Sequence, residues 1–551
     1  MRYLFSFLIL LLLTACSRQQ KADLVVKNAK IWTVNENQPE AEALAVQNGK
    51  IVAVGHSAEI EKWIDKDTRV IDAGGKRIVP GFTDAHTHFL TGGQSLLTID
   101  LRDCQNEQEF LARLKTYADK LPPGRWVTEG NWDHERAFGG VLPTRQLIDK
   151  ATPNNPVAIN RTDGHMLLAN SLALKLAKIT KDTPTPAGGV IVKNPKTGEP
   201  TGIFKDAAMG LVYNVIPAAT PEELDDALAA AMKYAAVVGV TSIHDMLGWG
   251  DWYAYERARR QGKLTVRVSA YFPISTWERV VALRDSVKQD EWLRVGGLKG
   301  FVDGSLGSST ALMFAPFADD PLNRGTYVSD WFRTGMMHQF VKAADSAGLQ
   351  IAIHAIGDSA NSEMLDIYER VEKENGLKDR RFRIEHAQHL HPKDIARFQT
   401  LGVIPSMQPY HCIDDGRWAE KRLGAERSKT TYAFRSLLDT GANLSFGSDW
   451  FVAPLDPIQG IYAAVTRRTL DDGHPDGWVS EQKISVAEAV KCYTINDAYA
   501  EFAEKAKGSL EVGKWADFVM LSDDIFAIEP AKIREVKVTM TVVGGKVVFE
   551  E

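Results

Sequence analysis

Two histidines lie two positions apart at the end of an apolar run, in the segment PGFTDAHTHFL at residues 80–90. Alternate residues of a β-strand share one face, so His86 and His88 are predicted to point in the same direction. They either pack into a core or bind a group that takes two imidazoles. Residues of ligand type also stand near the C-terminal ends of later strand-like runs: Lys299, His354, His386 and Asp449.

Together these six residues could hold a divalent metal, if the fold brings them into one place. Imidazoles and a carboxylate suit zinc or a similar borderline cation. Such a cation supplies hydroxide near neutral pH and polarises a carbonyl, which is what the hydrolysis of a stable amide requires. A carboxylate beside the water can take its proton and later deliver it to the amide nitrogen. Asp449 is the candidate for this proton shuttle.

The middle of the chain alternates strand-like runs with helical ones, which is typical of a parallel α/β fold. One helical run, PEELDDALAAAMKYAAVVG, has Pro221 at its first turn and Gly239 at its expected C-terminal cap. Ten strand candidates can be counted, two more than an eight-stranded barrel uses. In (β/α)₈ barrels the chemistry lies at the C-terminal ends of the strands, where residues far apart in sequence converge.

Short β-type runs and turns occupy both ends of the remaining chain. Asn48-Gly49 between two such runs is a strong hairpin signal, and Gly544-Gly545 stands at a similar turn near the C-terminus. Neither end alone has enough strands for a stable core. We therefore predict one β-sandwich domain built from residues 23–79 plus 505–551. The alternative is two unrelated caps.

The N-terminus MRYLFSFLILLLLTAC has an early Arg, an apolar run too short to span a membrane, and then Cys16. It resembles a bacterial lipoprotein signal peptide with its lipobox. The resemblance implies cleavage of residues 1–15, a lipid on Cys16 and a polar tether over residues 16–22. A lipid-anchored, periplasm-facing protein of the cell envelope is expected, with the outer membrane as one destination. The alternative is a plain signal peptide whose cysteine is there by chance.

The ordered motifs of the chain resemble those of the metal-dependent amidohydrolase superfamily. They are H-x-H in DAHTH, the Lys before FVDGSLGSSTA, and the ligand-type residues of AIHAIGD, RIEHAQ and GSDW. The segments VDGSLGSSTA, RTDGHMLLANS and PTGIF are similar to the N-substituted formamide deformylase-like branch, also called amidohydrolase 3. The resemblance covers about residues 22–550.

This resemblance implies a fold. A distorted TIM (β/α)₈ barrel would occupy residues 80–504, with a large insertion at about residues 90–235 that takes up the two surplus strands. The barrel strands would be those that carry His86 and His88, Ile243, Val268, Lys299, His354, His386, Ser406 and Asp449.

It also implies a role for each ligand-type residue. His86, His88 and Asp449 would bind the more buried metal, and His354 and His386 the second. Lys299, carboxylated by CO₂, would bridge the two ions, for which zinc is the expected metal. If Lys299 instead reaches solvent or pairs with a carboxylate such as Asp303, a mononuclear site remains. His244 is a rival ligand, or a group that contacts a ligand or the substrate.

The expected partner is a small amide, and five residues are candidates for contacting it: Trp132, Asp133, His165, Gln408 and Tyr410. The predicted reaction is metal-dependent hydrolysis of an amide, N-acyl or N-formyl C–N bond. Alternatives on the same metal core are a D-aminoacylase-like or dipeptidase-like enzyme, and a catalytically silent binding lipoprotein. The net charge of −6, without a basic stripe, argues against a nucleic-acid partner. Homo-oligomerisation stays open.

Overall fold

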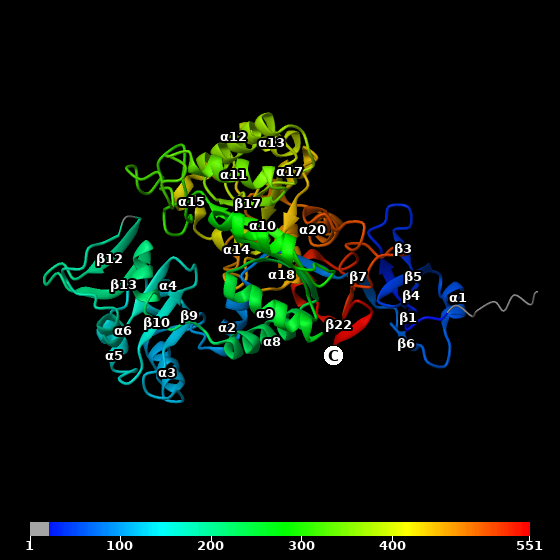
Figure 1. The fold of residues 1–551 in the computed structure, drawn as a ribbon, viewed down its shortest axis with the longest axis horizontal. Coiled ribbons are helices and arrows are strands. Elements are labelled where there is room, and N and C mark those ends of the chain that lie inside the picture. The colour runs from blue at the N-terminus through cyan, green and yellow to red at the C-terminus, as the bar shows by residue number, and fades with distance from the viewer. Residues whose placement is uncertain (1–20, 187) are drawn as a thin grey trace, which may run out of the picture.

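The computed structural model describes residues 21–186 and 188–551. A central barrel carries the insertion on one side and the β-sandwich on the other (Figure 1). The predicted lipid-bearing Cys16 and the signal peptide lie outside the described residues. Within those residues, no helix is both long enough and apolar enough to cross a membrane.

Eight parallel strands form the barrel, as predicted, and they are the strands that the resemblance implied. A parallel bridge between Thr87 and Trp450 brings the last strand back against the first. In order around the barrel the strands are β8 (Phe82–Thr87), β14 (Val240–Met246), β15 (Arg267–Pro273), β16 (Leu293–Phe301), β17 (Gln350–Ala355), β18 (Arg383–His386), β19 (Ile404–Met407) and β20 (Ser445–Phe446).

Helices alternate with these strands along the chain, and α8 (Pro221–Val237) shows how the local sequence sets their ends. Thr220 accepts from the backbone N–H of Glu223, and Glu223 bonds back to Thr220 in a capping box. After the helix, Gly239 takes a φ of +81°, which a glycine adopts at little cost. Both predicted end signals of this helix are therefore confirmed.

Most of the other helices of the barrel domain bury apolar residues with the strands in one large core, to which α16 and α20 do not contribute. The helices other than α8 are α2 (Phe89–Leu97), α9 (Trp249–Arg260), α10 (Trp277–Ser286), α11 (Met336–Ser346), α12 (Asp358–Asn375), α13 (Ile395–Thr400), α14 (Pro409–Asp415), α15 (Ala419–Leu423), α16 (Ala425–Ser428), α17 (Phe434–Asp439), α18 (Pro457–Thr466), α19 (Val486–Cys492) and α20 (Ile495–Ala500).

The insertion folds around a five-stranded sheet of its own and has its own hydrophobic clusters. The two surplus strand candidates form β9 and β10 of this sheet. Its strands are β9 (Val127–Trp132), β10 (Val157–Arg161), β11 (Met166–Ala169), β12 (Gly189–Lys193) and β13 (Pro200–Asp206). Its helices are α3 (Glu107–Ala118), α4 (His134–Phe138), α5 (Arg145–Asp149), α6 (Ser171–Leu176) and α7 (Gly210–Tyr213).

The β-sandwich takes strands from both chain ends, which confirms this part of the predicted fold. Its two sheets have the orders β5-β4-β1-β6 and β23-β22-β21-β7-β2-β3. Asn48 and Gly49 both have positive φ between β4 and β5, so the predicted hairpin is present. The strands are β1 (Leu24–Lys27), β2 (Lys30–Trp32), β3 (Glu40–Ala41), β4 (Ala43–Gln47), β5 (Lys50–Gly55), β6 (Arg69–Asp72), β7 (Arg77–Pro80), β21 (Phe518–Leu521), β22 (Val538–Val543) and β23 (Lys546–Glu550). The segment between β5 and β6 holds the α-helix α1 (Ser57–Ile60).

Candidate metal centre

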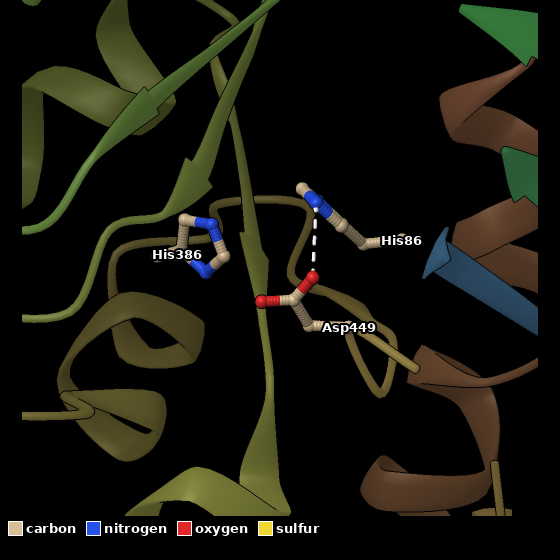
Figure 2. Close-up of side chains that lie close together, drawn as sticks. All are labelled: His86, His386 and Asp449. Carbon is tan, nitrogen blue, oxygen red and sulfur yellow. Dashed lines mark ion pairs between the residues drawn. The ribbon is translucent and has the colours of Figure 1, made fainter. Parts of the chain in front are cut away.

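Three of the predicted ligands form a tight buried group at the C-terminal end of the barrel. The ligand atoms of His86, His386 and Asp449 all lie within 4.8 Å of one another (Figure 2). They come from β8, from the last residue of β18 and from the turn after β20. Neighbouring parallel strands end on the same side of a barrel, which explains why residues so distant in sequence meet here.

The other three predicted ligands border the same site. His88 Nε2 lies 3.3 Å from Asp449 Oδ1, and Lys299 Nζ lies 3.2 Å from His86 Nε2. The rings of His354 and His386 are 4.5 Å apart, measured between their centroids. All six residues line one cavity, so the structure brings the whole predicted ligand set together.

Each of the four histidines donates from one ring nitrogen, which leaves a lone pair on the other. The lone pair on Nε2 of His86 faces the Lys299 ammonium at 3.2 Å. Nδ1 of His86 donates to Glu385, 2.5 Å away, and Nδ1 of His386 donates to Gln408, 2.7 Å away. Nδ1 of His88 donates to the carbonyl of Met246 at 3.1 Å. Each of these bonds fixes the tautomer in which Nε2 keeps its lone pair, as in histidines that ligate metals.

His354 has the opposite arrangement, since its Nε2 donates to the carbonyl of Gly304 at 3.1 Å and Nδ1 stays free. Burial lowers the pKa of His354 and of His386 well below the usual value. Burial and the nearby Lys299 lower the pKa of His86 to about 4. The three imidazoles are therefore neutral near pH 7, which metal ligation requires.

Asp449 carries a buried oxygen that the protein does not satisfy. Within the described part of the chain, its Oδ1 has no hydrogen-bond partner. Burial alone would raise the pKa of Asp449, but the neighbouring His86, His88 and His386 hold it well below the usual range. An ionised, buried carboxylate oxygen without a donor is costly unless it binds a cation. The donor set and this oxygen together fit a divalent metal.

Two of the ligand candidates hold a backbone conformation that non-glycine residues rarely adopt. His386 has a φ of +72° and Asp449 a φ of +59°. Each such residue costs on the order of 1–3 kcal/mol and persists only where the surroundings enforce it. With this backbone conformation, the side chains of His386 and Asp449 lie beside His86. The strained backbone is therefore part of the geometry that brings the three ligand candidates together.

Lys299 is buried at the end of β16 with its neighbours on the strand. Burial lowers the pKa of its ammonium to about 8. It does not pair with Asp303, whose carboxylate accepts instead from the backbone N–H groups of Leu312, Ile356 and Gly357. The alternative in which Asp303 neutralises Lys299 is therefore wrong.

A buried ion pair below the site was not predicted as part of it. Arg383 donates to both carboxylate oxygens of Glu385 at 2.7 and 3.0 Å, and both residues are completely buried. Glu385 in turn holds His86. The sequence signal is an Arg and a Glu two positions apart on one strand, which places both on the same face of that strand.

His244, the alternative ligand candidate, forms its contacts outside the group of metal ligands. Its Nδ1 accepts from Arg383 at 2.6 Å, and its Nε2 lies 3.6 Å from Glu501. It is completely buried and does not line the cavity of the metal ligands. His244 therefore contacts the Arg383–Glu385 pair and takes no part in the group of ligand atoms.

The cavity above the ligands has a volume of about 1270 Å³ and is walled by the barrel loops and the insertion. Three of the predicted substrate-contacting residues line it: Asp133, His165 and Tyr410. His165 is held by Asp206, since its Nδ1 donates to Oδ1 at 2.8 Å. The insertion thus supplies a wall to the site on the barrel.

The two other predicted substrate contacts need correction. Trp132 is completely buried in the insertion, where its indole N–H donates to the carbonyl of Ile159. Gln408 is also completely buried, and it holds His386. Neither residue lines the cavity. The sequence placed them near strand ends but did not show which way their side chains point.

The substitution Glu385→Gln is expected to destabilise the protein by about 3–5 kcal/mol, because it leaves the buried Arg383 without its counter-charge. Metal affinity should also fall about 10–100-fold, since His86 loses its charged acceptor. The urea midpoint and a competition assay with a metal chelator measure the two effects. Glu369→Gln, which weakens the surface pairs with Lys373 and Arg397, serves as the control and should change little. A Glu385→Gln protein with normal stability and metal affinity would contradict this role.

Comparison with known proteins agrees with this geometry. A model described as "Amidohydrolase family" matches residues 69–549. The chain is 41% identical to Protein LONG AFTER FAR-RED 3 of Arabidopsis thaliana, over 96% of this chain and 92% of that protein. It is 28% identical to N-substituted formamide deformylase of Arthrobacter pascens, over 96% of this chain and 99% of that enzyme.

Among solved structures, the chain resembles an uncharacterized metal-dependent hydrolase from Pyrococcus horikoshii, with a TM-score of 0.77 and 29% identity. This likeness covers 92% of this chain and 99% of the other. Family match, fold and buried ligand group agree. The chain belongs to the amidohydrolase family and is a metal-dependent hydrolase.

Proposed function

We propose that this protein hydrolyses the C–N bond of an N-acyl or N-formyl amide. The observation that carries the proposal is the buried group of His86, His386 and Asp449 at the floor of a wide cavity. Similarity to an N-substituted formamide deformylase supports the N-formyl class. The four histidines each keep one ring nitrogen that carries a lone pair and no proton, which supports a working ligand set over a catalytically silent binding site.

The residues that would hold the cations are the six predicted ligands. His86, His88 and Asp449 would bind one ion, His354 and His386 the other, and carboxylated Lys299 both. When bound, two divalent cations supply polarisation of the carbonyl and a lower pKa for water. Zinc is the proposed metal, because imidazole and carboxylate donors suit it.

Asp449 would transfer the proton during hydrolysis, and the cavity would accommodate the substrate. The Asp449 carboxylate accepts a proton from water as the water oxygen bonds to the carbonyl carbon. It then delivers that proton to the amide nitrogen as the C–N bond breaks, so that a carboxylic acid and an amine leave. The low pKa of Asp449 keeps it ionised and ready to accept the proton. The cavity exceeds the usual 300–1,000 Å³ of small-molecule sites, so the substrate can be larger than a simple formamide.

A substrate panel tests the proposal. Purified protein is incubated with N-formyl amines, N-acetyl amines, N-acyl-D-amino acids and dipeptides, and both the acid and the amine product are quantified. Turnover of the first two classes, lost on chelation and regained with zinc, is the expected result. Turnover of N-acyl-D-amino acids or dipeptides alone would show that the enzyme is D-aminoacylase-like or dipeptidase-like instead. Metal binding without turnover of any compound would contradict an enzymatic role.

We also propose that a lipid on Cys16 anchors the protein to the cell envelope, supported by the lipobox-like sequence alone. Cys16→Ser is expected to release the protein from membranes, because no thiol remains for the lipid, and to leave catalysis unchanged. Fractionation after a salt wash and incorporation of labelled palmitate measure this. Ser17→Ala, which keeps the thiol, should still take up the label. Cys16→Ser protein that stays with the membrane would overturn the anchor.

A further inference from the structure

A second, smaller pocket lies beside the metal ligands and differs in character from the main cavity. Its volume is about 190 Å³, and almost all of its surface is apolar. Its apolar wall consists of Met246, Leu247, Pro273, Ile274, Phe301 and Trp331. We call it the side pocket.

The side pocket adjoins the reaction centre. It lies at the C-terminal ends of β14, β15 and β16, the same end of the barrel as the ligands. His88, Lys299 and Phe301 line both the side pocket and the main cavity. A molecule whose amide group lies at the ligands can therefore reach into the side pocket with a neighbouring group.

Three polar side chains that line the side pocket interact with other groups of the protein. The hydroxyl of Tyr271, whose ring lines the pocket, donates to Gln350 at 2.6 Å. Nδ1 of His88 donates to the carbonyl of Met246. The ammonium of Lys299 lies 4.7 Å from the ring centroid of Phe301 and 3.2 Å from His86. These side chains offer the pocket mainly carbon surface, so it favours an apolar occupant.

We propose that the side pocket binds an apolar ring or branched chain attached to the amide nitrogen of the substrate. The size fits, because an apolar cavity of about 150 Å³ accepts a benzene ring. This proposal rests on the proposed function. In an N-formyl substrate the acyl side carries only a hydrogen, so the nitrogen substituent is the group large enough to fill the pocket.

Two matched substrate series test the assignment. One contains N-formyl amines with methyl, isobutyl and cyclohexylmethyl groups on nitrogen. The other keeps N-methyl on nitrogen and places the same apolar groups on the acyl side. Each methylene that becomes buried should raise kcat/KM about fourfold. Cyclohexylmethyl adds six carbons to methyl, so we expect a rise of about 10³-fold or more in the nitrogen series and a much smaller rise in the acyl series.

A variant links that size dependence to the side pocket. Ser275 is an exposed residue at its rim, so Ser275→Trp fills space without disturbing the core. It should reduce the ratio of kcat/KM between the cyclohexylmethyl and methyl substrates at least tenfold. Ser286→Trp, at the exposed end of α10, is the control and should keep the wild-type ratio. Circular dichroism and metal content verify that both variants fold.

The outcomes separate the side pocket from the reaction itself. A nitrogen series without size dependence, a size dependence confined to the acyl series, or a ratio that Ser275→Trp leaves unchanged would each overturn the side-pocket assignment while the reaction stands. Failure of the metal-loaded wild type to hydrolyse any compound of either series would overturn the proposed function, and the assignment with it.

Discussion

Asp449→Asn is expected to lower kcat by about 10²–10⁴-fold, the usual range for loss of a general acid–base. Asparagine keeps the shape of the side chain but cannot accept the proton from water at neutral pH. Because the histidines remain, the variant should retain part of its metal. Steady-state kinetics on the best N-formyl or N-acyl substrate, together with metal analysis of the same sample, measure both effects.

The control for this variant is Asp414→Asn. Asp414 also lines the cavity, but it pairs with Arg417 and lies outside the ligand group. Its replacement should change kcat by no more than a few-fold. If Asp449→Asn protein is as active as the Asp414→Asn control, the proton transfer does not depend on Asp449.

Loss of Lys299 should remove metal and activity together. Among residues 21–186 and 188–551, no carboxylate lies within ion-pair distance of Lys299. Burial lowers the pKa of its amine to about 8, so the neutral form that reacts with CO₂ is accessible near pH 7. Carboxylation converts that amine into an anion with two oxygens, which can bridge metals roughly 3.5–4 Å apart. Lys299→Ala would remove the proposed bridge.

Rescue experiments distinguish a bridging anion from a merely structural lysine. Acetate or propionate added to Lys299→Ala protein should restore part of the metal and of the turnover. Wild-type protein reconstituted without CO₂ should recover slowly, and faster with bicarbonate. Lys205→Ala, which removes a cavity-lining lysine of the insertion, should behave as wild type. Full metal occupancy and normal turnover in Lys299→Ala would favour a mononuclear site.

Local patterns predicted the alternation of strands and helices and the ligand-type residues at strand ends, whereas the choice of the eight barrel strands and the role of each ligand came from the resemblance to the amidohydrolase superfamily. A strand that ends in a histidine or aspartate is visible in the sequence, and the barrel architecture brings such ends together. The hairpin at Asn48-Gly49 was predictable for the same reason, since its conformation depends on the two turn residues themselves.

Side-chain direction at strand ends could not be predicted. Gln408 follows β19 and points back to His386, whereas Tyr410, two positions later, lines the cavity. The positive φ of His386 and of Asp449 breaks the alternation on which a strand pattern depends. Such conformations are imposed by the packed surroundings and leave no signal in the local sequence.

The Glu385–Arg383 pair escaped prediction for a different reason. Charged residues on a strand usually indicate the face that is exposed to solvent. In a barrel of parallel strands, however, both faces of a strand are buried. Here the inward face holds a buried ion pair that fixes a ligand. The spacing of Arg383 and Glu385 shows that they share one face of the strand, but it does not show whether that face points into the barrel.

We expect the group of His86, His386 and Asp449 to hold the metal on which hydrolysis depends. Reconstitution of chelator-treated protein, with bound metal per chain and turnover measured on the same samples, tests it most directly. Turnover should rise with occupancy and level off at two ions per chain, and a protein with both His86→Ala and His386→Ala should bind little metal. Full turnover of metal-free protein would show that hydrolysis does not depend on a metal. Normal metal content in the double variant would show that these residues do not hold it.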